Sequence, residues 1–207
     1  FANHPEVGVV SSSFLRWAGG EWPEAFLKPA VLDVEALVPR LSGYAFHEYV
    51  LDNQLFGTVL FRREVVEEVG DFDKALPPSD DWDYMIRASR VTQFAHLRDP
   101  TTLYRDHPNQ TSRKLPDVNT RVLFRKRVLR RFGWQSPDGT QVNKKAFRAA
   151  QGRACLSFGS AHYKKGSATK ALGAFFQAIA YQPWKINAYV YALLALPKCL
   201  KQTVIRS

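Results

Sequence analysis

The chain has 207 residues, of which 45% are hydrophobic and 23% are charged, so its composition is that of a folded protein rather than a disordered one. It contains no run of about 18 apolar residues, and the sequence therefore predicts no transmembrane helix. Its two cysteines, Cys155 and Cys199, are too few and too far apart for a disulfide framework or a thiolate zinc site, which predicts a reducing compartment.

Charge divides the chain into two unlike halves. Residues 1–100 contain 9 Lys and Arg against 16 Asp and Glu, whereas residues 101–207 contain 20 against 3. Acidic groups beside a turn can serve as bases or face a metal, while a long basic stretch suits the phosphates of nucleotides, nucleic acids or lipids. We therefore expect two parts with different roles, residues 1–115 and 116–207.

The acidic half alternates predicted strands and helices. The pattern predicts, in chain order, a strand over 7–14, a turn at Gly19 and Gly20, a short helix over 33–42, a strand over 56–61 and a helix over 62–70 that ends at Gly70. A helix from about 81 to 90 follows, and then a strand over 94–97 that ends at residues 99–100. This order of elements predicts an α/β fold.

The basic half is predicted to be helical. Its first helix ends at Gly133 and is expected to bury Val118, Val122, Val128, Leu129 and Phe132, with the basic residues, Arg125 among them, on the opposite side. A polar stretch over 135–143 separates this helix from a second helical region that runs almost to the C-terminus.

The densest chemical group is Ser79-Asp80-Asp81-Trp82-Asp83. Three carboxylates within four residues repel one another and raise the pKa of at least one of them, whereas the N-terminus of a helix opposes that rise. An ionised carboxylate held near a hydroxyl can act as a general base. The alternative is an acidic first turn that only caps the helix.

A second group, Tyr104-Arg105-Asp106-His107, follows the last predicted strand. The imidazole of His107 could bind a divalent metal through one ring nitrogen, with Asp106 or a backbone carbonyl orienting the other, although a lone histidine in a loop is also an ordinary polar residue. The residues after it, Thr111-Ser112-Arg113-Lys114, offer hydroxyl and cationic donors suited to diphosphate oxygens, or else form a solvated basic loop.

Three segments in this order, 57–73, 80–88 and 104–108, resemble the acceptor half of family 2 glycosyltransferases of the GT-A fold. The likeness covers about residues 1 to 114. The family's nucleotide-binding half and its D-x-D metal motif would precede Phe1. Because Met85 is the only methionine, we expect this chain to be a fragment.

The resemblance implies a role for several residues. Asp81 matches the catalytic base, with Asp80 as its acidic neighbour, where the family more often has Glu. His107 matches a histidine that completes the coordination of the metal on the donor diphosphate, which would be manganese or magnesium. Trp82 and Asp83 match positions beside the acceptor pocket, and Gly57 matches a small residue on the strand below it. Arg113 is expected to contact the diphosphate of the donor.

These matches imply an inverting glycosyltransferase. It would move a sugar from a nucleotide-diphospho-sugar to a hydroxyl of a glycan or lipid-linked acceptor, in the synthesis of cell-envelope or surface polysaccharides. We expect it in the cytoplasm or peripherally on the cytoplasmic face of the membrane. The alternative is a non-catalytic interaction module built on a glycosyltransferase-like scaffold.

The tail has a pattern of its own over about 155–188. Large, small and aromatic residues fall at the offsets of one tetratricopeptide-like repeat of about 34 residues: Cys155, Phe158, Gly159, His162, Gly166, Ala171, Phe175, Ala178 and Pro183. A single repeat cannot bury its own apolar face and must pack on a neighbouring element. A simple helical hairpin is the alternative.

The surplus of basic residues has three interpretations. No motif for reading bases or grooves is present, so we expect no nucleic-acid partner. Lys and Arg beside Trp184, Tyr189, Tyr191 and Leu193 favour attachment to an anionic membrane surface. A solvated cationic face is the common alternative.

Overall fold

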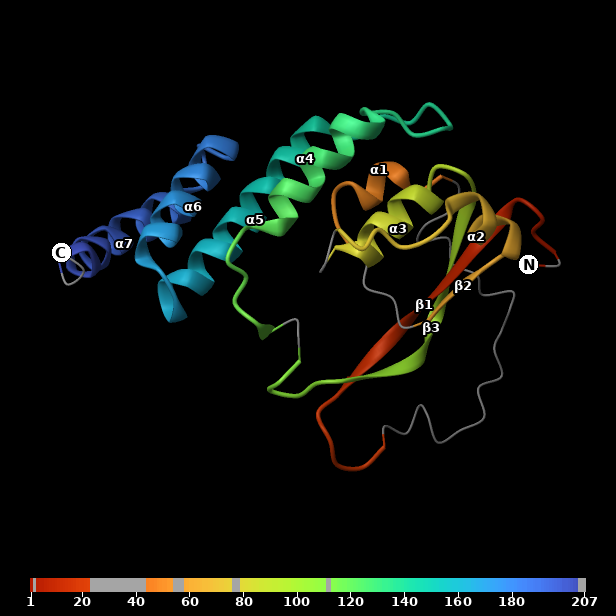
Figure 1. The fold of residues 1–207 in the computed structure, drawn as a ribbon, viewed down its shortest axis with the longest axis horizontal. Coiled ribbons are helices and arrows are strands. Elements are labelled where there is room, and N and C mark those ends of the chain that lie inside the picture. The colour runs from red at the N-terminus through yellow and green to blue at the C-terminus, as the bar shows by residue number, and fades with distance from the viewer. Residues whose placement is uncertain (2, 23–43, 54–57, 76–78, 111–112, 205–207) are drawn as a thin grey trace. The chain divides into compact units, whose positions relative to one another are not determined.

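The computed structural model describes residues 1, 3–22, 44–53, 58–75, 79–110 and 113–204. Its elements are those of a mixed α/β protein (Figure 1). The chain forms two compact units: residues 1–113 with 134–141, and residues 114–133 with 142–207. The units differ from the predicted division after residue 115, because residues 114 and 115 belong to the second unit and the polar segment 134–141 belongs to the first.

The first unit is built on three described strands in the order β2-β1-β3. β1 (Val7–Trp17) runs antiparallel to β2 (Val59–Phe61) and parallel to β3 (Gln93–Arg105). The strand predicted over 7–14 is confirmed and is longer than expected, while the helix predicted over 33–42 lies outside the described residues.

The end predicted for β3 at residues 99–100 is wrong, because the strand continues through Pro100 to Arg105. A proline has no N–H to give to the ladder, and inside a sheet it is tolerated at edges and bulges. Pro100 pairs with Ser13 at a shift in register, and regular pairing resumes from Phe14 and Thr102 onward. The bulge therefore lets the strand pass a residue that normally ends one.

Short helices α1 (Phe46–Tyr49), α2 (Arg63–Val69) and α3 (Asp80–Ala88) complete the first unit (Figure 1). Helix α2 ends at Gly70, as predicted, with a φ of 73° that favours glycine. The core of the first unit contains side chains from both helices and strands. Tyr49 of α1 is fully buried, and its ring lies 5.4 Å from the ring of Phe94 on β3. Ile86 of α3 is likewise fully buried.

The second unit consists of α4 (Thr120–Phe132), α5 (Lys144–Lys165), α6 (Ala168–Tyr181) and α7 (Ile186–Val204) (Figure 1). Side chains cap three of these helices, since Asn119, Asn143 and Ser167 each accept a hydrogen bond from the backbone N–H three residues later. Gly133 ends α4 with a φ of 75°, as the sequence predicts.

One face of α4 was predicted incorrectly. Val122 and Val128 are buried as expected, but Arg125 is also buried, with 3% of its surface exposed, while Val118 is 49% exposed. Phe124 is buried as well, so the buried side of the helix includes positions between the two valines. Arginine is rarely enclosed by protein, so a pattern based on residue type places it on the solvent side and does not anticipate this burial.

Helices α5 and α6 form a close-packed hairpin through small residues. A Cβ atom added at Gly159 would lie 2.6 Å from the ring of Phe175, which is fully buried. Cys155, Ala171 and Ala178 are buried in the same region. A tetratricopeptide-like repeat and a simple hairpin share this arrangement, so the repeat remains a prediction.

Substitution of Gly159 tests that packing. We expect Gly159→Val to lower the free energy of unfolding of the helical unit by about 1–3 kcal/mol, because the Phe175 ring has to move. Gly173 is the control: it lies inside α6, as Gly159 lies inside α5, but a Cβ there meets nothing within 4 Å. Gly173→Ala should instead stabilise the unit by about 0.4–1 kcal/mol. Urea unfolding followed by circular dichroism measures both; equal stability of wild type and Gly159→Val would contradict the close approach.

Candidate functional site

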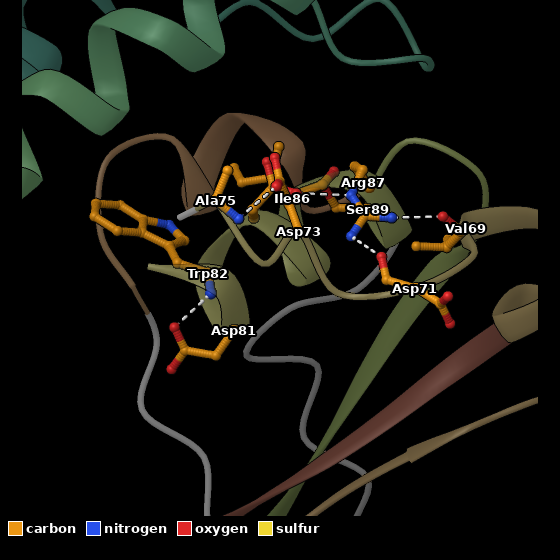
Figure 2. Close-up of polar contacts among 10 residues, drawn as sticks. Val69, Asp71, Asp73, Ala75, Asp81, Trp82, Ile86, Arg87 and Ser89 are labelled. Carbon is orange, nitrogen blue, oxygen red and sulfur yellow. Dashed lines mark hydrogen bonds and ion pairs between the residues drawn. The ribbon is translucent and has the colours of Figure 1, made fainter. Parts of the chain in front are cut away.

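The N-terminal end of α3 carries the acidic group, including Asp81 (Figure 2), and this helix is fixed from two sides. Trp82 is 3% exposed, and its indole N–H donates to the carbonyl oxygen of Tyr49 at 2.8 Å. One turn further along α3, Arg87 donates to the backbone carbonyl oxygens of Val69 and Asp71. These bonds tie α3 to α1 and to the end of α2, so the first turn of α3 is held in place.

The three carboxylates of this turn have different environments. Asp83 is buried at 4% exposure, and its Oδ2 lies 2.7 Å from Nε of Arg87 in an ion pair. Asp80 is half-buried and Asp81 is exposed. A buried charge normally keeps a partner, and Asp83 has one, which leaves Asp80 and Asp81 as the carboxylates open to a ligand.

The surroundings raise the pKa of Asp81 above its ordinary value. The main cause is partial desolvation by neighbouring protein atoms, even though the residue is exposed at the surface. The backbone N–H of Trp82, which donates to Oδ1 of Asp81 at 2.6 Å, opposes the rise, as does a hydrogen bond from Asn53, while the charge of Asp80 adds to it. The sequence predicted a raised pKa in this group from repulsion alone, and repulsion is the smaller contribution.

The second acidic and basic group lies where β3 ends. Asp106 accepts from Arg113 at 2.6 Å, and its other oxygen lies 3.9 Å from Arg16. The backbone N–H of His107 donates to Oε1 of Gln110 at 3.0 Å, and the imidazole is half-exposed. Arg113 thus has its charge balanced by a carboxylate in this structure, and Asp106 faces two guanidinium groups rather than His107.

Two of the acceptor residues implied by the resemblance, Trp82 and Asp83, are enclosed by protein. Their side chains hold α3 in position, as described above, instead of lining an exposed surface. The third, Gly57, lies outside the described residues, as do Thr111 and Ser112. Within the described part of the chain, no three His, Cys, Asp or Glu side chains gather in a group that could hold a metal ion.

A row of hydroxyl groups crosses the sheet, and the sequence analysis did not single it out. Ser11 and Ser13 of β1 lie 3.0 and 3.1 Å from the two ring nitrogens of the buried His96 of β3. On the opposite face, Ser12 contacts Thr101. Three consecutive serines, residues 11–13, were the signal in the sequence that could have indicated this row. Their partners on β3, however, lie more than 80 residues away along the chain.

Comparisons with protein-family models, with curated proteins and with solved structures found no match. Among the described helices, none has both the length and the apolar character needed to cross a membrane.

Proposed function

We propose that this chain is the acceptor-side part of an inverting GT-A glycosyltransferase and that Asp81 is its general base. The observation that carries the proposal is the contrast within the first turn of α3. Asp83 is buried and forms an ion pair with Arg87. Asp81, in contrast, is exposed, has a raised pKa and lies on a helix that Trp82 and Arg87 hold in place. A base needs this combination of access, firm position and a pKa nearer to the working pH.

In the proposed reaction, the carboxylate of Asp81 takes the proton of an acceptor hydroxyl as that oxygen attacks the anomeric carbon of the donor sugar. The bond from this carbon to the diphosphate breaks on the opposite side, and the nucleoside diphosphate leaves with the bonding electrons. Asp80 favours the protonated form of its neighbour through its own charge. Trp82 and Asp83 act on the acceptor indirectly, by holding the base in position.

The donor diphosphate would require a divalent cation, manganese or magnesium, to balance its charge. From the described residues His107 would contribute one imidazole ligand, and the diphosphate oxygens would supply others. Arg113 would have to leave Asp106 in order to contact the diphosphate. Its side chain is about half exposed, which permits that movement.

A nucleotide-sugar panel tests the proposal. We would measure thermal shift and release of nucleoside diphosphate, with and without manganese, on the 207-residue chain and on the longest natural form of the protein. A bound donor raises apparent stability by mass action. A metal-dependent shift together with turnover on a glycan or lipid-linked acceptor is the expected result, and the responding nucleotide identifies the donor. No shift and no turnover in either form would favour the non-catalytic interaction module.

A further inference from the structure

Helix α7 has one face packed against the protein and a second apolar face that is exposed. Its inner face consists of small residues: Ala188, Ala192 and Ala195 are buried against the other helices. The opposite side, which we call the outer face, consists of large apolar residues with exposed fractions between 39% and 75%: Ile186, Val190, Leu193, Leu194, Leu196 and Leu200. Soluble proteins rarely expose such a continuous apolar surface unless it binds something.

The outer face is too wide for a narrow helix–helix seam. At 100° per residue, Ile186, Val190, Leu193 and Leu200 fall within an arc of about 80°, with Leu194 on one side of it and Leu196 on the other. In a two-helix seam the flanking positions are commonly charged, whereas here they are leucines. An apolar face of this width suits a continuous apolar medium.

The charge of the helical unit indicates which kind of partner surface the outer face of α7 attracts. The helical unit, residues 114–133 with 142–207, contains 18 Lys and Arg but only one acidic residue, Asp117. No Asp or Glu occurs anywhere from residue 139 to 207. Two copies meeting through this unit would therefore bring like charges together, while an anionic surface would be attracted.

The ends of the outer face carry groups typical of a membrane interface. Trp184, 58% exposed, and the exposed Lys185 lie just before α7, and the exposed Lys201 lies near its C-terminal end. Tryptophan favours the headgroup level of a bilayer, and each lysine near an anionic leaflet adds attraction. Lys198 points elsewhere, since its ammonium group contacts the carbonyl oxygen and the ring of Tyr163 on α5.

From this geometry we infer that the outer face of α7 docks on an anionic lipid bilayer, with the helix lying in the plane of the interface. The leucine side chains enter the acyl boundary, and the lysines at either end contact lipid phosphates. The inference is independent of the proposed transferase activity, since it uses residues of the helical unit alone.

Vesicle sedimentation tests the inference on the complete 207-residue chain. Wild type should sediment with phosphatidylcholine vesicles that contain phosphatidylglycerol, bind phosphatidylcholine alone much more weakly, and dissociate as salt is raised. Leu193→Glu should weaken binding to the anionic vesicles by about tenfold or more, because it places a charge in the apolar boundary. The matched control is Leu123→Glu on α4, where the leucine is 55% exposed and lies outside α7. That variant should bind almost as wild type does.

Sedimentation velocity without lipid tests whether a second copy of the chain, instead of a bilayer, covers the outer face. The inference requires a monomeric wild type under the same low-salt conditions. A wild type that ignores every vesicle but self-associates, with Leu193→Glu monomeric, would overturn it in favour of a second copy. Equal loss of vesicle binding in both variants would show that charge alone drives binding, and would also overturn it. A wild type that neither binds lipid nor self-associates would also overturn it, and an acidic protein would be the next partner to test.

Discussion

Replacement of Asp81 by asparagine should reduce sugar transfer by about 10²–10⁴-fold, the usual contribution of a general base. Asparagine keeps an oxygen that can accept from the Trp82 backbone N–H, so the helix N-terminus retains its bond. Only the ability to take a proton is lost. Initial rates of nucleoside diphosphate release, with and without acceptor, measure the effect, and donor binding by thermal shift should be nearly unchanged.

The raised pKa of Asp81 leads to two further expectations, one for the pH dependence of the rate and one for stability. Because that pKa is raised, the wild-type rate should fall as pH drops through a value above the ordinary aspartate pKa of about 3.9, and this acid limb should be missing from the residual activity of Asp81→Asn. A folded-state pKa above the unfolded one means that the ionised form costs stability at neutral pH. Asp81→Asn should therefore be at least as stable as wild type at pH 7.

Two comparisons keep the Asp81 experiment decisive. Asp138→Asn makes the same chemical change in an exposed turn of the first unit and should leave transfer unaffected. Asp80→Asn should reduce the rate less than Asp81→Asn and shift the acid limb to lower pH, because it removes a charge that raises the pKa of Asp81. Transfer at the normal rate in Asp81→Asn would remove this residue from the role of base.

Replacement of Arg87 by methionine should lower the free energy of unfolding of the first unit by about 3–5 kcal/mol. Methionine leaves Asp83 as a buried charge without its partner, and it also removes the donors to the carbonyl oxygens of Val69 and Asp71. The side chains of Arg87 and Asp83 are 13% and 5% exposed, so water cannot replace the lost bonds efficiently. Chemical denaturation at pH 7 measures the loss.

The neighbouring helix α2 supplies the matched control for Arg87. Arg63 and Glu67 have the same spacing of four residues and a similar distance of 3.1 Å, but their side chains are 88% and 67% exposed. Arg63→Met should cost only about 0.3–0.5 kcal/mol, as exposed pairs on a helix do. Similar losses in both variants would mean that Asp83 and Arg87 are more hydrated than the structure has them, and that α3 is not fixed through this pair.

If α3 positions the base, the Arg87 variant should also slow transfer in the folded protein. The expected change is in kcat more than in KM, because the acceptor would still bind while the carboxylate of Asp81 loses its fixed orientation. Arg87 would then act as a positioning residue, and the pH at which the rate falls in the Arg87 variant would report whether the surroundings of Asp81 have changed.

Local sequence determined most of the helices and their ends. Gly70 and Gly133 end α2 and α4 because each adopts a positive φ that other residues avoid. The acidic run at the start of α3 and the alternation of strand and helix patterns are likewise local features. They could be predicted because the physical causes, backbone conformation and the spacing of apolar residues, lie within a few positions of one another.

The tertiary structure alone decided what the three carboxylates of α3 can do. All three lie within four residues of one another, but Asp83 faces Arg87 in the interior while Asp81 is exposed. It also decided that Arg125 is buried, that β3 passes through Pro100 at a bulge, and that α7 exposes leucines rather than covering them. Each of these outcomes depends on residues distant along the chain, because burial and pairing are set by what packs against a side chain and not by the residue type itself.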